Sequence, residues 1–295
     1  MRNPPSVTST AYLPGISFRE TNTPGGPSGL GVQGMTAGTE DSLPSSIASL
    51  MPIFVVAPAT GAEPVSTVAL EQEIPQGTST IRADLQVGSP RPWQLNDPCL
   101  YRATGRIKAA GSSSAHETSA RFGFRDFRFA DGYFRLNGRR VLWRFAHTGA
   151  DTPGTIRVPY DPGLLRRDLL NAKVMGFNAI RFIAGVAKRY QLDLCDEIGL
   201  MVYEEAYASW CLADSPQMAE RFDESILGMV RRDRNHPSVT MWGLLNETPD
   251  GPVFRHAISV LPALRQKMNT SIIPAANPPI SEWKPRWTGI PPLSR

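Results

Sequence analysis

The sequence predicts an antiparallel β-sandwich followed by a parallel α/β unit. From Ile53 to about Phe129, short alternating segments are separated by Gly, Pro and Ser, which is typical of a small β-sandwich. After Phe134, β-branched or aromatic runs alternate with amphipathic helical stretches, which favours parallel βα units. A chain of 295 residues has room for both units, since domains average ~150 residues.

The boundaries of three regions follow from these changes in pattern. Residues 1–50 carry few large apolar side chains and many turn formers, so we expect them to be disordered or misassigned. Residues 51–129 are expected to form the sandwich, with strands in IFVV, VSTVAL, TSTIRADLQV and LYRATGRIKA. Because fewer than about seven strands are visible, we expect this sandwich to be incomplete. Residues 130–295 contain the α/β unit and an irregular C-terminal tail.

The first βα unit has clear start and stop signals. We expect a strand at about residues 141–145. Asp161 is a candidate N-cap and Pro162 fits the first turn of a helix, which repeats its apolar residues at helical spacing until Gly176. The next strand is predicted in FNAIRFI.

The same pattern then repeats. A second helix, about 190–198, ends at Gly199 and precedes the strand LMVYEEA; a third, about 218–232, precedes the strand VTMWGLLNE. Four strands with helices between them form half of an eight-stranded barrel, but a doubly wound open sheet has the same local pattern. Periodicity alone therefore leaves both architectures open.

Composition argues against several classes of partner. The net charge is +4, from 31 basic and 27 acidic residues that are largely interspersed, so we expect no nucleic-acid partner. No apolar stretch reaches the roughly 18 residues that span a bilayer, so we expect no membrane partner. The N-terminus lacks the basic-then-apolar order of a signal peptide, which makes a cytoplasmic location the default expectation.

The cysteines do not suggest a metal or a disulfide framework. The 3 cysteines, Cys99, Cys195 and Cys211, are widely separated and show no CxxC spacing. We also see no cluster of ligands in the sequence that would justify a metal site. We therefore expect reduced, mostly buried thiols and no metal.

Polar side chains close three of the predicted strands. Asn246 and Glu247 end the fourth strand, Glu204 and Glu205 end the third, and Arg181 lies near the end of the second. Because the carboxyl ends of parallel strands meet at one edge, we expect these residues to lie together there. Glu204 and Glu205 must point to opposite faces by strand alternation, and the sequence does not say which faces the site.

Six blocks carry a resemblance to a known family. FGFRDFRF, LNGRRV, NAIR, LDLCDEIGLMVYEEA, RDRNHPSV and WGLLNE, in this order and at these intervals, resemble the β-galactosidases and β-glucuronidases of glycoside hydrolase family 2. The resemblance covers about residues 85–260. WQLNDPCLYR also resembles the end of that family's immunoglobulin-like domain.

The resemblance implies a fold, a reaction and roles for individual residues. It implies an immunoglobulin-like β-sandwich before a (β/α)₈ TIM barrel, and hydrolysis of β-hexosides with retention and without a cofactor. Glu247 matches the family's acid/base and Asn246 matches the partner of the sugar 2-hydroxyl. Arg181 matches an arginine near the nonreducing sugar. The identity of the sugar lies beyond the sequence.

Additional residues are weaker candidates for the site. His147 follows the first strand near a position where relatives have histidine, with a structural role as the alternative. Trp210 and Tyr207 follow the third strand and could stack on a sugar face, or simply pack. His236 lies in a predicted turn, where we expect a structural role.

The C-terminal residues depart from the family pattern. A retaining enzyme needs a second carboxylate about 5–5.5 Å from the acid, and the family takes this nucleophile from strand seven. After Glu247 we expect one helix, 253–267, interrupted by Pro262, and then a proline-rich tail whose carboxylate is Glu282. We therefore expect a barrel truncated within its second half, with the nucleophile absent and the isolated chain inactive. The alternatives are a noncatalytic carbohydrate-binding fragment, or a subunit that self-associates or needs a complementing chain.

Overall fold

The structure is a computed structural model that describes residues 48–61, 63–74, 85–109, 115–148, 161–183, 185–207 and 212–268, residues 81 and 83, and two short strands. Those strands, β1 (Arg19–Thr21) and β2 (Gly29–Gly31), pair antiparallel. The rest of the segment predicted to be disordered, up to residue 47, lies outside the described residues. Among the described helices, none has the length and apolar character needed to cross a bilayer.

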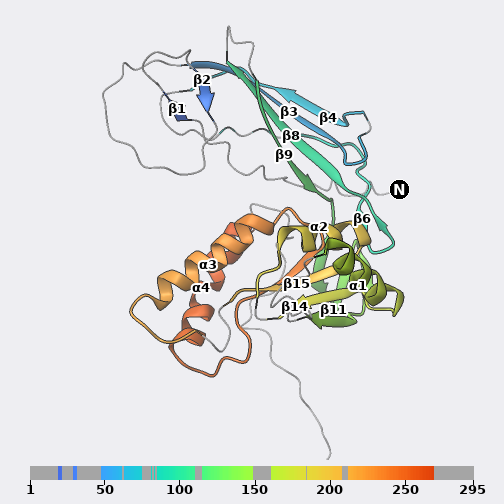
Figure 1. Ribbon diagram of the computed structural model, residues 1–295, viewed down its shortest axis with the longest axis vertical. Coiled ribbons are helices and arrows are strands. Elements are labelled where there is room, and N and C mark those ends of the chain that lie inside the picture. Colours follow the sequence, from blue (N-terminus) through green and yellow to red (C-terminus); the bar gives the residue numbers. More distant parts are fainter. Residues whose placement is uncertain are drawn as a thin grey trace, which may run out of the picture.

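The first large sheet is antiparallel and contains five strands in the order β4-β3-β8-β9, with β5 also paired to β3 (Figure 1). Alternate side chains turn inward, so that Val56, Tyr101, Ala103, Phe122 and Phe124 form its buried core. The strands are β3 (Ala48–Pro58), β4 (Ser66–Ala69), β5 (Gln72–Ile74), β8 (Tyr101–Ala109) and β9 (Ala115–Phe122).

One strand predicted for this region does not form where the structure describes it. Within the segment TSTIRADLQV, Ile81, Ala83 and residues 85–87 are not in a strand. Leu85 and Val87 instead pack against the core of the antiparallel sheet while partly exposed. The alternation of apolar residues in this segment therefore reflects packing against the sheet rather than strand pairing.

Short antiparallel elements connect the two large sheets. A two-stranded hairpin, β6 (Trp93–Gln94) and β7 (Asp97–Pro98), precedes β8. A three-stranded sheet follows β9 and consists of β10 (Phe127–Ala130), β11 (Tyr133–Leu136) and β12 (Arg139–Val141). Its Phe127 and Leu136 form a buried cluster with Trp93, Ala179 and Met201. Ala179 and Met201 belong to the parallel sheet, so these short elements cover the face of that sheet that we call its inner face.

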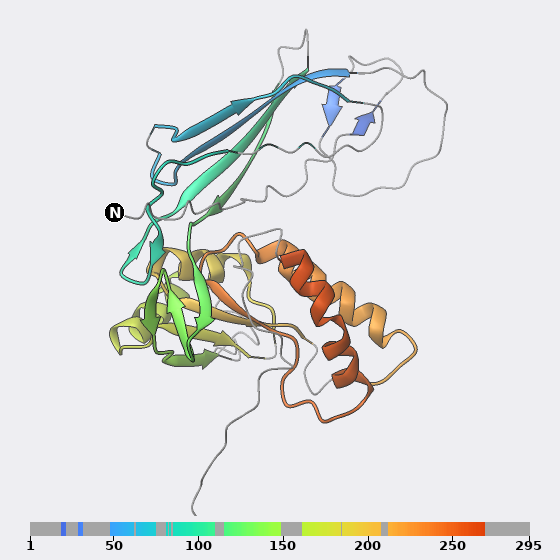
Figure 2. The ribbon, with the colours of Figure 1, turned by 180° about the vertical axis from the view of Figure 1, so that it is seen from behind.

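The second large sheet is parallel and has four strands in chain order, β13-β14-β15-β16 (Figures 1 and 2). Its outer face packs against helices through a cluster that includes Leu165, Leu192, Ile180 and Val202. The strands are β13 (Phe145–Thr148), β14 (Ala179–Phe182), β15 (Met201–Glu205) and β16 (Val239–Gly243). The helices are α1 (Pro162–Val174), α2 (Arg189–Ile198), α3 (Met218–Asp233) and α4 (Pro252–Met268).

The strand order favours a barrel over a doubly wound sheet. A doubly wound sheet reverses its strand order at a switch point, whereas these strands follow one another without reversal. Within the described residues the sheet is partial and does not close. The predicted combination of an antiparallel β unit followed by a partial parallel α/β unit is confirmed.

Local signals placed the first two helices correctly. Asp161 accepts a hydrogen bond from the backbone N–H of Gly163 at 2.8 Å, and Pro162 occupies the first helical turn. Gly176, after α1, and Gly199, at the end of α2, have φ values of 92° and 76°. Glycine adopts these left-handed values without steric cost, which explains why the helices stop there.

Three predicted boundaries were wrong. The strand predicted at 141–145 is divided, because Val141 pairs with Phe134 in the preceding small sheet and the parallel strand begins at Phe145. The fourth strand ends at Gly243 rather than at Glu247, whose φ of 48° is incompatible with a strand. Pro262 lies inside α4, on its exposed side, where the carbonyl that it leaves unpaired can face water.

Buried polar contacts join the antiparallel region to the parallel sheet. Arg125 is buried and donates to the carbonyl oxygens of Pro237, at 2.5 Å, and of Val239. Burial lowers the pKa of Arg125 to about 10, so it remains charged at neutral pH. Trp93 donates its indole N–H to the carbonyl oxygen of Asp196 at 2.8 Å. These contacts fix the start of β16 relative to the residues that follow β9.

We predict that Arg125→Ala destabilises the chain by about 2–4 kcal/mol, because it leaves two buried carbonyl groups without a donor. Arg128→Ala is the matched control: Arg128 is exposed and pairs with Asp126 on the surface, so we expect a change within about 0.5 kcal/mol. Urea unfolding of the three proteins measures the difference. Equal midpoints for Arg125→Ala and Arg128→Ala would contradict the role of Arg125.

Candidate active site

The register of the parallel strands decides which polar side chains share a face. Arg181 on β14 lies opposite Tyr203 on β15, and Glu205 on β15 lies opposite Gly243 on β16. Because side chains alternate along a strand, Arg181, Tyr203 and Glu205 face the inner side of the sheet. Glu204 faces the helices.

Three residues make direct contact on the inner side, at the carboxyl edge of the sheet. The Nε of Arg181 donates to Oε1 of Glu205 at 2.7 Å, and its Nη2 donates to Oδ1 of Asn246 at 2.5 Å. The side chain of Glu205 is only 1% exposed. Arg181 therefore compensates the buried charge of Glu205 and holds Asn246, which comes from the segment after β16.

Glu204 lies in a separate environment behind the sheet. Its side chain is fully buried, accepts a hydrogen bond from the backbone N–H of Ala187 at 3.2 Å and contacts Arg232 at 3.5 Å. Burial is the main cause that raises the pKa of Glu204 well above its ordinary value, and the nearby Asp233 carboxylate raises it further. Of the two glutamates that the sequence left undecided, Glu205 is the one beside Arg181 and Asn246.

Asn246 carries a polar atom that is free to bind a ligand. The residue is 8% exposed, and its Oδ1 is held by Arg181. Its Nδ2 is buried and has no hydrogen-bond partner among the described residues. A buried amide donor without an acceptor is costly, and an oxygen of a bound molecule would remove that cost.

Glu247 occupies an unusual position beside this cluster. It is exposed and has a φ of 48°, a left-handed backbone that costs a residue with a side chain about 1–2 kcal/mol. Among the described residues its carboxylate makes no hydrogen bond or ion pair. The second carboxylate that a retaining enzyme needs near its acid is therefore not in contact with Glu247 among the described residues.

Of the weaker candidates, His147 lies beside Arg181 in the sheet. His147 is exposed and lies in register with Arg181 on the neighbouring strand. Tyr207 is exposed just after β15, and Trp210 lies outside the described residues. Tyr203 was missed by the sequence reasoning, although strand alternation places it two residues before Glu205 on the same face.

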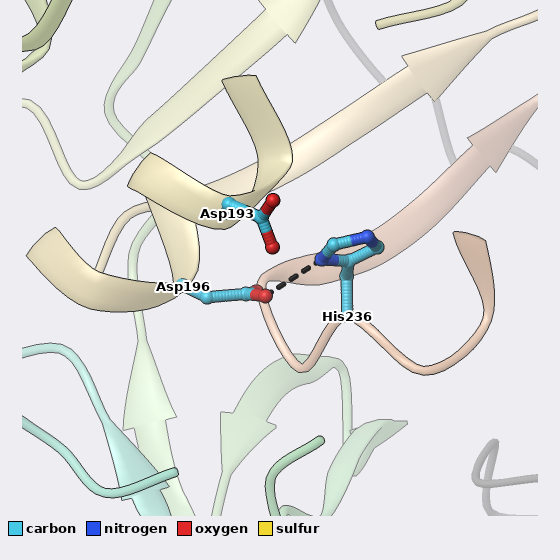
Figure 3. Close-up of side chains that lie close together, drawn as sticks. All are labelled: Asp193, Asp196 and His236. Carbon is cyan, nitrogen blue, oxygen red and sulfur yellow. Dashed lines mark hydrogen bonds and ion pairs between the residues drawn. The ribbon is translucent and has the colours of Figure 1, made fainter. Parts of the chain in front are cut away.

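A group of Asp193, Asp196 and His236 has its possible metal-ligand atoms within 4.8 Å of one another (Figure 3). Protein donors already engage these atoms. Asp196 contacts Nδ1 of His236 at 2.6 Å and accepts from the backbone N–H of Ser238 at 3.0 Å, while Asp193 accepts from Arg121 at 2.6 Å. We therefore infer that the group has a structural role: it connects α2 to the turn before β16.

The pKa of His236 is raised in this setting. Burial by itself lowers the pKa of the imidazole, but the neighbouring carboxylate of Asp196 and the more distant Asp233 and Asp193 outweigh it. His236 therefore favours the charged form in the folded chain more than in the unfolded chain.

We predict that the stabilisation from His236 is complete below pH ~6.5, the unfolded value, and is lost as the pH rises through the higher folded value. His236→Gln should reduce the fall in unfolding free energy across this window, and Asp196→Asn should remove the same pH-dependent part. Thermal or urea unfolding at a series of pH values measures it. A wild-type stability that rises across the window in step with that of His236→Gln would overturn the assignment.

Two models of known protein families match this chain. A family model described as the TIM barrel domain of glycosyl hydrolases family 2 matches residues 127–271, and a second model, described as glycosyl hydrolases family 2, matches residues 55–125. The polar cluster therefore lies at the carboxyl edge of a glycosidase barrel domain, the edge where barrel enzymes place their active sites. The chain belongs to glycoside hydrolase family 2.

The chain is similar to bacterial β-galactosidases and to a β-glucuronidase. A β-galactosidase of Aeromonas hydrophila is 32% identical over 203 residues, covering 66% of this chain, and β-galactosidase BgaC of Bifidobacterium adolescentis is 31% identical over 187 residues, covering 56%. The crystal structure of Parabacteroides merdae β-glucuronidase aligns with a TM-score of 0.66 at 28% identity, over 76% of this chain. The chain spans 19% and 17% of the two galactosidases and 29% of the glucuronidase.

Proposed function

We propose that this chain contributes the sugar-binding and acid/base half of a retaining β-glycosidase site that acts on β-hexosides. The observation that carries the proposal is the contact of Arg181 with Glu205 and Asn246 at the carboxyl edge of the parallel sheet, directly before Glu247. Relatives that are β-galactosidases and β-glucuronidases support the substrate class.

Each residue of the cluster has a role that its chemistry supports. The free Nδ2 of Asn246 donates to a hydroxyl oxygen of the sugar, and this bond strengthens as charge develops on the ring in the transition state. Arg181 fixes the orientation of that amide by holding its oxygen. Glu205 neutralises Arg181 and keeps its guanidinium in place. This chemistry requires no metal or cofactor.

Glu247 donates the proton to the leaving-group oxygen. Its exposure gives access to the aglycone side of the bond, and its left-handed backbone turns the chain sharply after Asn246. A residue held in a rare backbone conformation next to a buried polar cluster is typical of a functional site. Bound substrate would exclude water around this carboxyl group.

The nucleophile must come from another part of the site. Glu205 is the other carboxylate of the inner-face cluster, and it already accepts a hydrogen bond from Arg181. We propose that the attacking carboxylate comes from a strand beyond the four that the structure describes, either in the same polypeptide or in a complementing chain. Residues 1–295 alone should then bind sugar but hydrolyse little.

A noncatalytic carbohydrate-binding role is the second candidate. It is favoured by the contrast between the buried, preformed contact of Arg181 with Asn246 and the exposure of Glu247. In that case a chain that is completed by the remaining barrel strands would bind sugar and still show no turnover.

We predict that Glu247→Gln, in protein completed by the remaining strands, slows hydrolysis of an alkyl β-galactoside by about 10²-fold or more, because a poor leaving group needs the proton as its bond breaks. A dinitrophenyl β-galactoside should slow by less than about tenfold, since its phenolate departs without protonation. Values of kcat/KM for both substrates measure the contrast, because they report on cleavage of the glycosidic bond and not on the later step that the same residue assists as a base. Glu224→Gln, on the exposed face of α3, is the matched control and should leave both rates unchanged.

Two outcomes would contradict these assignments. Equal slowing of the alkyl and dinitrophenyl substrates would exclude Glu247 as the general acid. Rapid hydrolysis of either substrate by the 295-residue chain on its own would show that its nucleophile lies within the chain.

A further inference from the structure

Arg181 lies against the aromatic ring of Tyr203. The Cζ of Arg181 is 5.1 Å from the centre of the ring of Tyr203, its register neighbour on β15. A guanidinium at this distance is attracted to the negative face of the ring, more strongly where water is excluded. Tyr203 therefore supports Arg181 from the side of β15, the strand between β14 and β16.

The ring of Tyr203 is itself held by other aromatic residues. Its centre lies 6.3 Å from that of Phe145, and Phe145 packs edge-on against Trp143 at 4.5 Å. Trp143 in turn stacks on Phe134 of the small antiparallel sheet at 4.7 Å. We call Phe134, Trp143, Phe145 and Tyr203 the aromatic column. It connects the small sheet to Arg181 through rings that have few rotatable bonds.

The hydroxyl of Tyr203 reaches the second member of the ion pair. Burial raises the pKa of this phenol, and the nearby carboxylate of Glu205 raises it further. The charge of Arg181 opposes the shift without cancelling it. One side chain thus contacts Arg181 through its ring and Glu205 through its hydroxyl.

Gly243 provides the space that this arrangement needs. A Cβ atom at Gly243 would lie 2.5 Å from Cε2 and 2.9 Å from Oη of Tyr203, and would overlap Cγ of Glu205. The overlap involves the side chains that make the network, so any larger residue at this position would displace them. The position of Tyr203 therefore requires glycine at residue 243.

We propose that Tyr203, seated on the aromatic column and in the space above Gly243, is a positioning residue that fixes the Arg181–Glu205 pair for sugar binding. The reference to sugar rests on the function proposed above, whereas the positioning itself is a property of the free chain. Tyr203 acts through Arg181 and Glu205 and need not touch the substrate.

The experiment uses the 295-residue chain without ligand and makes two measurements on the contact between the hydroxyl of Tyr203 and the Arg181–Glu205 pair. The first measurement is the ionisation of Tyr203, taken from the absorbance difference between wild type and Tyr203→Phe in rapid pH jumps that precede alkaline unfolding. In Glu205→Gln, this ionisation should move to lower pH, because the carboxylate that opposes it is gone. The second is the exchange of the Arg181 Nε–H with water by NMR, which Tyr203→Phe should speed about fivefold, because the polar hydroxyl beside Glu205 is lost.

Tyr133→Phe is the matched control. Tyr133 also lies under an arginine, with Arg140 Cζ 3.7 Å from its ring, but it is 42% exposed and distant in the chain from the pair. It should leave the exchange of Arg181 unchanged. Circular dichroism checks that each variant is folded, and the NMR signals of the Tyr203 ring report the same ionisation in wild type and Glu205→Gln without the Tyr203→Phe variant.

Two results would overturn the proposal: a Tyr203 ionisation that is unchanged in Glu205→Gln, or an Arg181 exchange rate that is the same in wild type and Tyr203→Phe. A tyrosine that only fills space would give both. Binding of isopropyl β-D-thiogalactoside, measured in parallel, distinguishes failure of the positioning role of Tyr203 from failure of the proposed sugar binding. If neither the wild type nor any variant binds the sugar while both spectroscopic effects are present, the proposed function is contradicted and the positioning role is still supported.

Discussion

The site depends on the ion pair between Arg181 and Glu205. Glu205 is almost completely buried, and a buried carboxylate without a partner would cost several kcal/mol, so the guanidinium must lie where it does. The same guanidinium holds the oxygen of Asn246 and leaves its Nδ2 as a buried donor. One charge-compensating contact therefore determines both where the amide points and what kind of atom it can receive.

This pair is placed by contacts at the opposite edge of the sheet, where β16 begins. Arg125 holds the carbonyl oxygens of Pro237 and Val239, and Asp196 holds His236 and the backbone of Ser238, so the start of β16 is fixed on two sides. The register of β16 then brings Gly243 opposite Glu205. The polar residues of the RDRNHPSV segment, which carry no chemistry at the site, thus explain why the site has its geometry.

The sequence predicted the elements better than the contacts. Capping residues and glycines located α1 and α2, and the polar ends of three strands identified Arg181, Glu205 and Asn246 as neighbours at one edge. The choice between Glu204 and Glu205 requires the register between strands, which local patterns do not contain. The left-handed backbone of Glu247 and the role of Gly243 also depend on tertiary packing, since nothing in the residue types alone requires them.

Saturation-transfer NMR with isopropyl β-D-thiogalactoside tests whether this polar cluster binds a sugar. The 295-residue chain should transfer saturation to the sugar ring protons, and Asn246→Ala should abolish the transfer, because the buried Nδ2 is the donor that the ligand satisfies. A Gln substitution at the exposed Glu224 should leave it intact. Transfer that is equal in wild type and Asn246→Ala, or absent from the folded wild-type chain, would contradict the account.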